Sequence, residues 1–250
     1  MRDIEPDPAY HANCIEKGLT PEQMPRHVAF IMDGNGRWAK AQLKERTFGH
    51  QHGSETIRRI LNFSGAYGIQ NITVYAFSTE NWKRPKKEVN FLMDYIEKTI
   101  DKEYDNFIKN KVQVCFLGEL EGLPKTLQEK IKFTQEATKN NTKLRLNILL
   151  NYGSRSEIVN AFKKLANEKK DLTNITETDI SNHLYTAGIP DPELIIRTAG
   201  EYRLSNFLLF QAAYSELFFS DVLWPDFDET HLFEILKDYQ KRDRRFGGLN

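Results

Sequence analysis

Five short apolar runs recur at wide spacing along the chain and are rich in β-branched and aromatic residues. They are HVAFIM (27–32), ITVYAFS (72–78), VQVCFLG (112–118), LRLNILLNYG (144–153) and ELIIRTAG (193–200). Nearly continuous apolar positions, rather than alternating polar and apolar ones, are typical of strands that are buried on both faces. Each run therefore predicts a strand inside a sheet.

The segments between these runs are amphipathic and predict helices. Over 53–67, apolar residues share one face and Gly68 marks the end of the helix. Over 85–109, apolar residues recur at three- and four-residue steps, with acids and lysines opposite. Further helices are expected near 124–139, 155–169, 177–187 and 229–245. Strands that alternate with helices predict a single α/β domain with a mostly parallel central sheet and helices on both faces.

The chain before the first strand has a different character. Residues 1–26 are polar, contain Pro6, Pro8, Pro21 and Pro25, and show one short helical stretch near 11–17. We therefore expect a peripheral N-terminal arm over 1–26 and a catalytic domain over 27–250.

Charge and composition narrow the range of partners. The 250 residues include 35 Lys and Arg and 35 Asp and Glu, so the formal net charge is zero. No overall field would attract a polyanion, and we expect no nucleic acid partner. Two cysteines suggest no disulfide framework. No apolar run is long enough to span a bilayer and the N-terminus has no apolar core of a signal peptide, so we expect a cytoplasmic protein.

Candidate chemistry follows the first predicted strand. In an open parallel sheet the ligand crevice lies at the carboxyl ends of the strands. Here the first run is followed by Asp33, Gly34, Asn35, Gly36, Arg37 and Trp38. Glycines let backbone N–H groups approach phosphate oxygens, and an arginine can bind two oxygens at once. Arg46 and His50, placed before the helix expected at 53–67, could add donors to the same anion.

The sequence disfavours three other kinds of site in this loop: a dinucleotide site, a nucleoside triphosphate site and a zinc site. The string matches G-x-G-x-x-A, but a dinucleotide site also needs an acid about 20 residues on, and here the second strand ends about 45 residues later. No G-x-x-x-x-G-K-[ST] string for a nucleoside triphosphate occurs. His50 and His52 form an H-x-H pair, yet zinc would need further ligands and the sequence shows no second cluster.

The second and fifth runs also end in polar residues. After the second come Ser78, Thr79, Glu80, Asn81, Trp82 and Arg84; helix capping by Ser78 or Thr79 would leave the last three unexplained. The fifth run contains Arg197 near its end and is followed by Arg203, Leu204 and Ser205. Five arginines thus lie in strand-end loops, more than one phosphate needs, and two diphosphates would explain the number.

Two acids have the best claim to a metal ion. Asp33 follows the first strand, and Glu216 lies near the end of the apolar run FLLFQAAYSELFF. Mg²⁺ binds through one or two carboxylates together with substrate phosphates. Mg²⁺ is therefore the cofactor that we expect.

These loops resemble the cis-prenyltransferases, and most closely the bacterial undecaprenyl diphosphate synthases. The strings that carry the resemblance are HVAFIMDGNGRWAK, FGH at 48–50, YAFSTENWKRP at 75–85, IRTAGEYRLSNFLLFQAAYSEL at 196–217, VLWPDFDE and RRFGG. They occur in the same order and run from about His27 to Gly248.

The resemblance implies a reaction and a role for each loop. Farnesyl diphosphate would bind Gly34, Asn35, Gly36, Arg37, Arg46 and His50, with Asp33 holding Mg²⁺ and assisting diphosphate departure. Isopentenyl diphosphate would bind Arg197, Arg203, Leu204 and Ser205, with Glu216 contributing to the metal. Asn81 would take part in proton removal, and Trp38, Ser78, Thr79, Glu80, Trp82 and Arg84 would position substrate. The product would be a long-chain polyprenyl diphosphate, undecaprenyl diphosphate.

The resemblance also implies a homodimer, an apolar product tunnel and peripheral membrane contact for product release. Arg245-Phe246-Gly247 matches a C-terminal pattern that reaches the partner's site in this family. The helix at 85–109 and the strands 72–77 and 144–150 could line the tunnel, or they could be plain core. Ala199, His52 and Ser154 depart from the family's usual residues and leave product length open. A short- or medium-chain synthase, or a non-catalytic subunit of this fold, are the alternatives.

Overall fold

The computed structural model describes residues 4–5, 7–168 and 172–243, so the expected role of Arg245 to Gly247 lies outside the described residues. The α-helices are α1 (Tyr10–Glu16), α2 (Asn35–Ala41), α3 (Arg46–Ala66), α4 (Lys86–Lys109), α5 (Lys125–Thr138), α6 (Ser154–Asn167), α7 (Glu177–Ser181) and α8 (Glu229–Gln240). The strands are β1 (His27–Ile31), β2 (Asn71–Ser78), β3 (Val112–Leu117), β4 (Leu144–Tyr152), β5 (Leu194–Arg197) and β6 (Glu216–Phe219).

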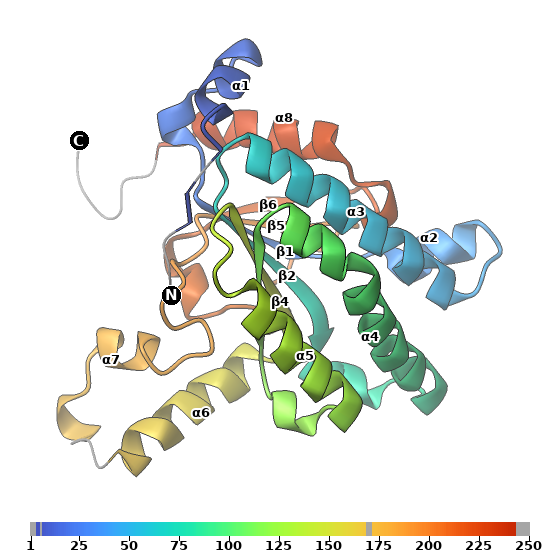
Figure 1. Ribbon diagram of the computed structural model, residues 1–250, viewed down its shortest axis with the longest axis vertical. Helices are drawn as coiled ribbons and strands as arrows, with labels where there is room; N and C mark the ends of the chain where they lie inside the picture. Colours follow the sequence, from blue (N-terminus) through green and yellow to red (C-terminus); the bar gives the residue numbers. More distant parts are fainter. Residues whose placement is uncertain (1–3, 6, 169–171, 244–250) are drawn as a thin grey trace.

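The strands form one parallel sheet in the order β3-β4-β2-β1-β5-β6 (Figure 1). The predicted α/β class and parallel sheet are therefore confirmed. The sequence did not predict β6, which lies half-exposed at the sheet edge. Its residues belong to a longer apolar run that also contains the short 3-10 helix Gln211–Tyr214, and the run gives no sign of where a strand would begin.

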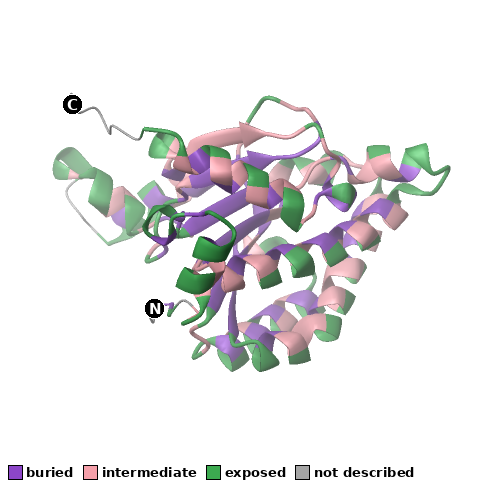
Figure 2. Ribbon diagram, turned by 90° about the horizontal axis from the view of Figure 1, so that it is seen from above, coloured by how far each residue is buried: buried purple, intermediate pink, exposed green. Residues whose placement is uncertain are grey.

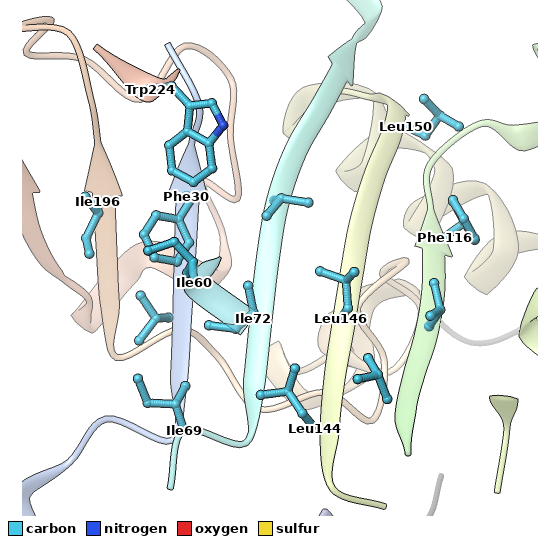
Figure 3. Close-up of a cluster of buried hydrophobic side chains, with 14 of the residues drawn as sticks. Phe30, Ile60, Ile69, Ile72, Phe116, Leu144, Leu146, Leu150, Ile196 and Trp224 are labelled. Carbon is cyan, nitrogen blue, oxygen red and sulfur yellow. The ribbon is translucent and has the colours of Figure 1, made fainter. Parts of the chain in front are cut away.

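Side chains of β1 alternate between the two faces of the sheet. Val28 and Phe30 belong to a large apolar cluster with residues of α3, α4, α5 and α8, whereas Ala29 and Ile31 belong to a second cluster on the opposite face. Figure 3 shows the first cluster, with Phe30 between Trp224 and Ile60. In Figure 2 the buried strands lie among helices whose outer surfaces are exposed. The sheet is therefore covered on both faces.

The segment before β1 is packed against the core rather than lying outside it. Cys14, Leu19 and Met24 are buried within the large apolar cluster. Asn13 Nδ2 donates to the carbonyl of Ala66 at the end of α3 (2.8 Å). These contacts fix α1 beside the carboxyl end of α3.

The prediction that a helix begins near residue 53 is wrong, because α3 already begins at Arg46. Gly49 and Gly53 lie inside this helix and allow its close packing. A Cβ at Gly49 would lie 2.0 Å from the backbone oxygen of Asn35. The glycine thus lets α3 approach the turn that carries the candidate chemistry. Among the described helices, none combines the length and apolar character needed to cross a bilayer.

Candidate active site

The candidate site lies where the chain leaves β1 and β5 in opposite directions. From β1 the chain returns to β2 on one side, and from β5 it continues to β6 on the other. Ile31 and Arg197 are register partners at the carboxyl ends of these strands. In parallel sheets such a switch point opens a crevice for ligands. Asp33 and Arg197 are therefore placed on either side of this crevice.

The backbone of Asp33 is fixed independently of its carboxylate. Its N–H donates to Thr198 Oγ1 (3.0 Å), and its carbonyl accepts from Thr198 Oγ1 (2.7 Å) and from the Trp224 N–H (3.0 Å). Gly34 follows at φ +106°, and a Cβ there would lie 2.9 Å from Leu223. The turn needs glycine for both its conformation and its packing.

The Asp33 carboxylate pairs with a buried arginine. Oδ2 lies 2.9 Å from Arg197 Nη2, and the Asp33 and Arg197 side chains are 34% and 5% exposed. Arg197 Nη1 donates to Ser205 Oγ (2.8 Å) and to the carbonyl of Arg203. Arg197 therefore connects the loop after β1 with the loop after β5.

A second cationic group surrounds His50 on α3. Glu88 Oε1 lies 3.2 Å from Arg46 Nε and 3.0 Å from Arg84 Nη1, so one carboxylate is shared by two guanidinium groups. Burial, and then the charges of Arg84 and Arg46, lower the pKa of His50 to about 4. Burial, and then the charge of Arg46, also lower the pKa of Arg84. An anion placed here would relieve this excess of positive charge.

Several buried polar atoms of the site have no hydrogen-bond partner. Asn35 Oδ1, His50 Nε2 and Arg197 Nε are three of the seven such atoms found among the described residues. Unpaired buried polar atoms are costly and call for an explanation. Because Asn35, His50 and Arg197 all line the same cavity, a bound polar ligand is the explanation that we favour.

The loop after β2 closes another side of the site. The Ser78 N–H donates to Asn81 Oδ1 (3.2 Å) within a reciprocal cap, so Asn81 does take part in capping, contrary to the sequence-based expectation. Trp82 Nε1 donates to Asn151 Oδ1 (2.7 Å), and its ring meets Phe77 edge-on. These contacts hold Asn81 at the edge of the cavity.

A cavity of about 520 Å³ leads away from these loops. Eight of the predicted site residues line it, namely Asp33, Asn35, His50, Ser78, Asn81, Arg84, Arg197 and Ser205. Deeper in, it lies between β2, β3 and β4 and the helices α3 and α4, and its lining includes Leu92, Ile96, Ile100, Phe107, Phe116, Leu146 and Ile148. A cluster of charged groups thus opens into an apolar space.

The other predicted residues lie around the cavity rather than in its lining. Arg37 Nη2 lies 3.7 Å from Asp33 and 3.5 Å from Glu201, which also pairs with Arg203. Trp38 is occupied elsewhere: Nε1 donates to Asp226 (2.6 Å) and the ring stacks on Phe48. Gly34, Gly36, Arg46, Thr79, Glu80, Trp82 and Leu204 belong to the same strand-end loops and to the start of α3 without being part of the lining.

Glu216 does not share a cation with Asp33 within one chain, which corrects the sequence-based expectation. It is the first residue of β6 and is the register partner of Leu194, whereas Arg197 beside Asp33 is the partner of Phe219. The two carboxylates therefore lie toward opposite ends of the sheet. Glu216 instead pairs with Arg242 Nη1 (2.6 Å). In the described ranges, no three His, Cys, Asp or Glu side chains gather as a potential metal site.

Sequence reasoning missed two asparagines that join the loops. Asn206 Nδ2 donates to Glu80 Oε1 (2.9 Å), while its Oδ1 accepts from the Arg155 N–H (2.9 Å). Asn151 accepts from Trp82 and donates to the carbonyl of Glu119 (2.8 Å). Both have positive φ, a conformation that asparagine tolerates better than most residues. The sequence contains one signal for these two residues, which is their position. Asn151 lies near the end of the fourth apolar run, and Asn206 directly follows Ser205.

Comparison with known proteins identifies the family to which this chain belongs. A family model described as "Putative undecaprenyl diphosphate synthase" matches residues 31–247. The chain belongs to this prenyltransferase family. An isoprenyl transferase of Fusobacterium nucleatum is 50% identical over 91% of this chain and 98% of its own length. A ditrans,polycis-undecaprenyl-diphosphate synthase, (2E,6E)-farnesyl-diphosphate specific, of Haemophilus ducreyi is 49% identical, covering 91% and 96%.

Solved structures of this prenyltransferase family show the same fold. Lavandulyl diphosphate synthase from Lavandula x intermedia, in complex with dimethylallyl diphosphate, matches with a TM-score of 0.86 and 34% identity over 90% of this chain and 99% of that one. A protein from Campylobacter jejuni described as a probable undecaprenyl diphosphate synthase matches with a TM-score of 0.76 and 32% identity, covering 89% and 98%. The family resemblance of the strand-end loops is thus confirmed, and the protein is a prenyltransferase.

Proposed function

We propose that this prenyltransferase condenses isopentenyl diphosphate onto farnesyl diphosphate in repeated cis additions, releasing diphosphate and giving undecaprenyl diphosphate. The observation that carries the proposal is the cavity itself. One end holds arginines and unpaired buried polar atoms, and the rest is lined mainly by apolar side chains of α3, α4 and the sheet, with the Arg58–Glu103 ion pair among them. An amphiphile with a diphosphate head and an isoprenoid tail fits both ends.

The allylic diphosphate would bind the loop after β1 and the start of α3. Gly34, Asn35 and Gly36 offer backbone N–H groups, and Arg37, Arg46 and His50 offer side-chain donors. His50 suits this role because it is neutral near pH 7 and its buried Nε2 has no partner. The tail would then enter the apolar part of the cavity.

Isopentenyl diphosphate would bind the loop after β5. Arg197 and Ser205 are already joined by a hydrogen bond, and the mostly exposed side chain of Arg203 pairs with Glu201. Anion binding would shift Arg203 from Glu201 to the phosphate. The two diphosphates would lie on either side of the Asp33–Arg197 pair.

The reaction breaks the allylic C–O bond, joins the allylic carbon to the terminal alkene carbon of isopentenyl diphosphate, and removes one proton. Negative charge develops on the leaving diphosphate, where preorganised donors lower the barrier most. Arg37, Arg46 and His50 would supply these donors. Asn81 would lie beside the departing proton; because an amide is a weak base, it would direct the proton to the released diphosphate.

The donor set also fits Mg²⁺, since Asp33 supplies one carboxylate at the diphosphate end and substrate phosphates supply further oxygens. When bound, Mg²⁺ would neutralise charge on the leaving diphosphate. Glu216 of the same chain lies too far away to join it. It could do so only from a second copy, in the homodimer that we also propose.

Two further parts of the proposal concern where the enzyme works. We place the enzyme in the cytoplasm, because both diphosphate substrates are water-soluble. A product with a long apolar tail would leave toward a membrane surface, which calls for peripheral contact. Cell fractionation and sedimentation with lipid vesicles test these two statements, and light scattering tests the dimer.

The deciding experiment is product analysis by mass spectrometry after incubation with farnesyl diphosphate, isopentenyl diphosphate and Mg²⁺, with chelator in a control. We expect an eleven-unit polyprenyl diphosphate that disappears with chelator. A shorter product would identify a short- or medium-chain synthase instead. Absence of product from folded protein that still binds both diphosphates would identify a non-catalytic subunit.

A further inference from the structure

The cavity follows the strands from their carboxyl ends to their amino ends, where Asp7 of the N-terminal segment lines it. Its far end is lined by Asp7, Asn110, Val112, Lys143 and Leu144. Val112 and Leu144 are register partners and the first residues of their strands. Along α4, the lining runs from Leu92 to Asn110, which is about 27 Å at the rise of an α-helix.

Residues of the N-terminal segment make direct contacts across this far end. The Asp7 carboxylate lies 2.8 Å from Lys143 Nζ. The Glu5 N–H donates to the carbonyl of Thr142 (2.7 Å), and Ile4 is buried. Asp7 also accepts from the Ala9 N–H (3.0 Å). The segment is thereby attached to the turn that precedes β4.

The same segment is attached to α3 on the other side of the opening. Asn13 donates to the carbonyl of Ala66, and the ring of Tyr10 fills the space beside Gly68. Ala66 and Gly65 themselves line the cavity. Glu5 and Asp7 therefore lie on the β4 side of the cavity end, and Tyr10 and Asn13 on its α3 side. In Figure 1, α1 lies at the top of the molecule, and α2, at the other end of α3, lies at the right.

We propose that residues 4–5 and 7–13, through the Asp7–Lys143 ion pair, form the end wall of the product cavity and limit product length. The proposal rests on the proposed function and extends it. The growing chain keeps its diphosphate beside Asp33, so its tail advances toward this wall. As far as Phe107 and Leu144 the lining is mostly apolar, although the Arg58–Glu103 ion pair also belongs to it. Beyond these residues it includes the charged Asp7 and Lys143, so further isoprene units gain little apolar burial there.

The ion pair is accessible enough to be altered without loss of the fold. The Lys143 and Asp7 side chains are 46% and 26% exposed. Ion pairs of this kind contribute little to stability. A change in product length on altering them would therefore report on the wall and not on general unfolding.

The test compares the wild-type enzyme with Lys143→Glu and with the charge-swapped Asp7→Lys/Lys143→Glu. Lys143→Glu places two carboxylates together and separates the wall from β4, so the main product should lengthen by at least one five-carbon unit. The swapped variant restores the attraction and should return the product to its original length. Mass spectrometry of the products and thermal melting of each variant are the measurements.

Lys139→Glu is the matched control, because Lys139 also forms an exposed ion pair, with Glu136, but lies outside the cavity lining. Its products should equal those of the wild type. Unchanged lengths in Lys143→Glu, or lengthening that the charge swap does not reverse, would overturn the end wall. Failure of the wild-type enzyme to make any polyprenyl diphosphate would instead overturn the proposed function.

Discussion

Replacing Asp33 by Asn should leave the fold intact and remove most of the turnover. Only the carboxylate charge changes, because Thr198 and Trp224 hold the Asp33 backbone. The Asp33–Arg197 contact of 2.9 Å corresponds to about 6 kcal/mol of Coulomb energy at an effective dielectric constant of about 20. The carboxylate is 34% exposed, so solvent screens it, and an amide oxygen still accepts from Arg197. We therefore expect a net loss of about 1–2 kcal/mol.

For a chain of this size, that loss lowers Tm by about 2–8 °C. Turnover should suffer far more, because charge on the leaving diphosphate develops in the transition state. Loss of one such stabilising group costs about 100- to 1,000-fold in kcat. Steady-state kinetics with farnesyl and isopentenyl diphosphates, beside a thermal melt, measures both quantities.

Calorimetry of farnesyl diphosphate binding without Mg²⁺ supplies the control for this variant. Binding should be retained, since the side chains assigned to this diphosphate, Arg37, Arg46 and His50, are unchanged. A kcat within about threefold of the wild type would refute the assigned role of Asp33. Complete loss of the cooperative unfolding transition would show that the backbone of Asp33 is not held independently of its carboxylate.

Two other expectations concern stability and loop positioning. Burial lowers the pKa of His27 from 6.5 to about 4, so its stabilising effect is complete above pH 6.5 and is lost as the pH falls toward 4. Between pH 6.5 and about pH 5, the free energy of unfolding should fall by about 2 kcal/mol less in His27→Gln than in the wild type. Urea titrations at each pH measure it, and equal slopes of this free energy against pH in the two proteins would contradict the expectation. Asn206→Ala removes the hydrogen bond to Glu80 and should lower kcat about tenfold with little change in Tm. An unchanged kcat would show that Asn206 does not position the two loops.

The fold class followed from local pattern, since continuous apolar runs between amphipathic segments permit little besides a covered parallel sheet. Element ends were less predictable. The first turns of helix α3, from Arg46, include Gly49, which packs against Asn35, a contact between elements that no local window contains. Strand β6 was missed because its residues continue a longer apolar run, in which nothing local marks where a strand begins.

By itself the sequence determined which loops carry the chemistry, because parallel strands bring their carboxyl ends to one edge and polar residues follow each of them. Only the tertiary structure decided which groups meet. It paired Asp33 with Arg197, gave Arg46 and Arg84 a shared carboxylate in Glu88, and separated Glu216 from Asp33. Strand order and register set these distances, and both depend on contacts between residues far apart in the chain.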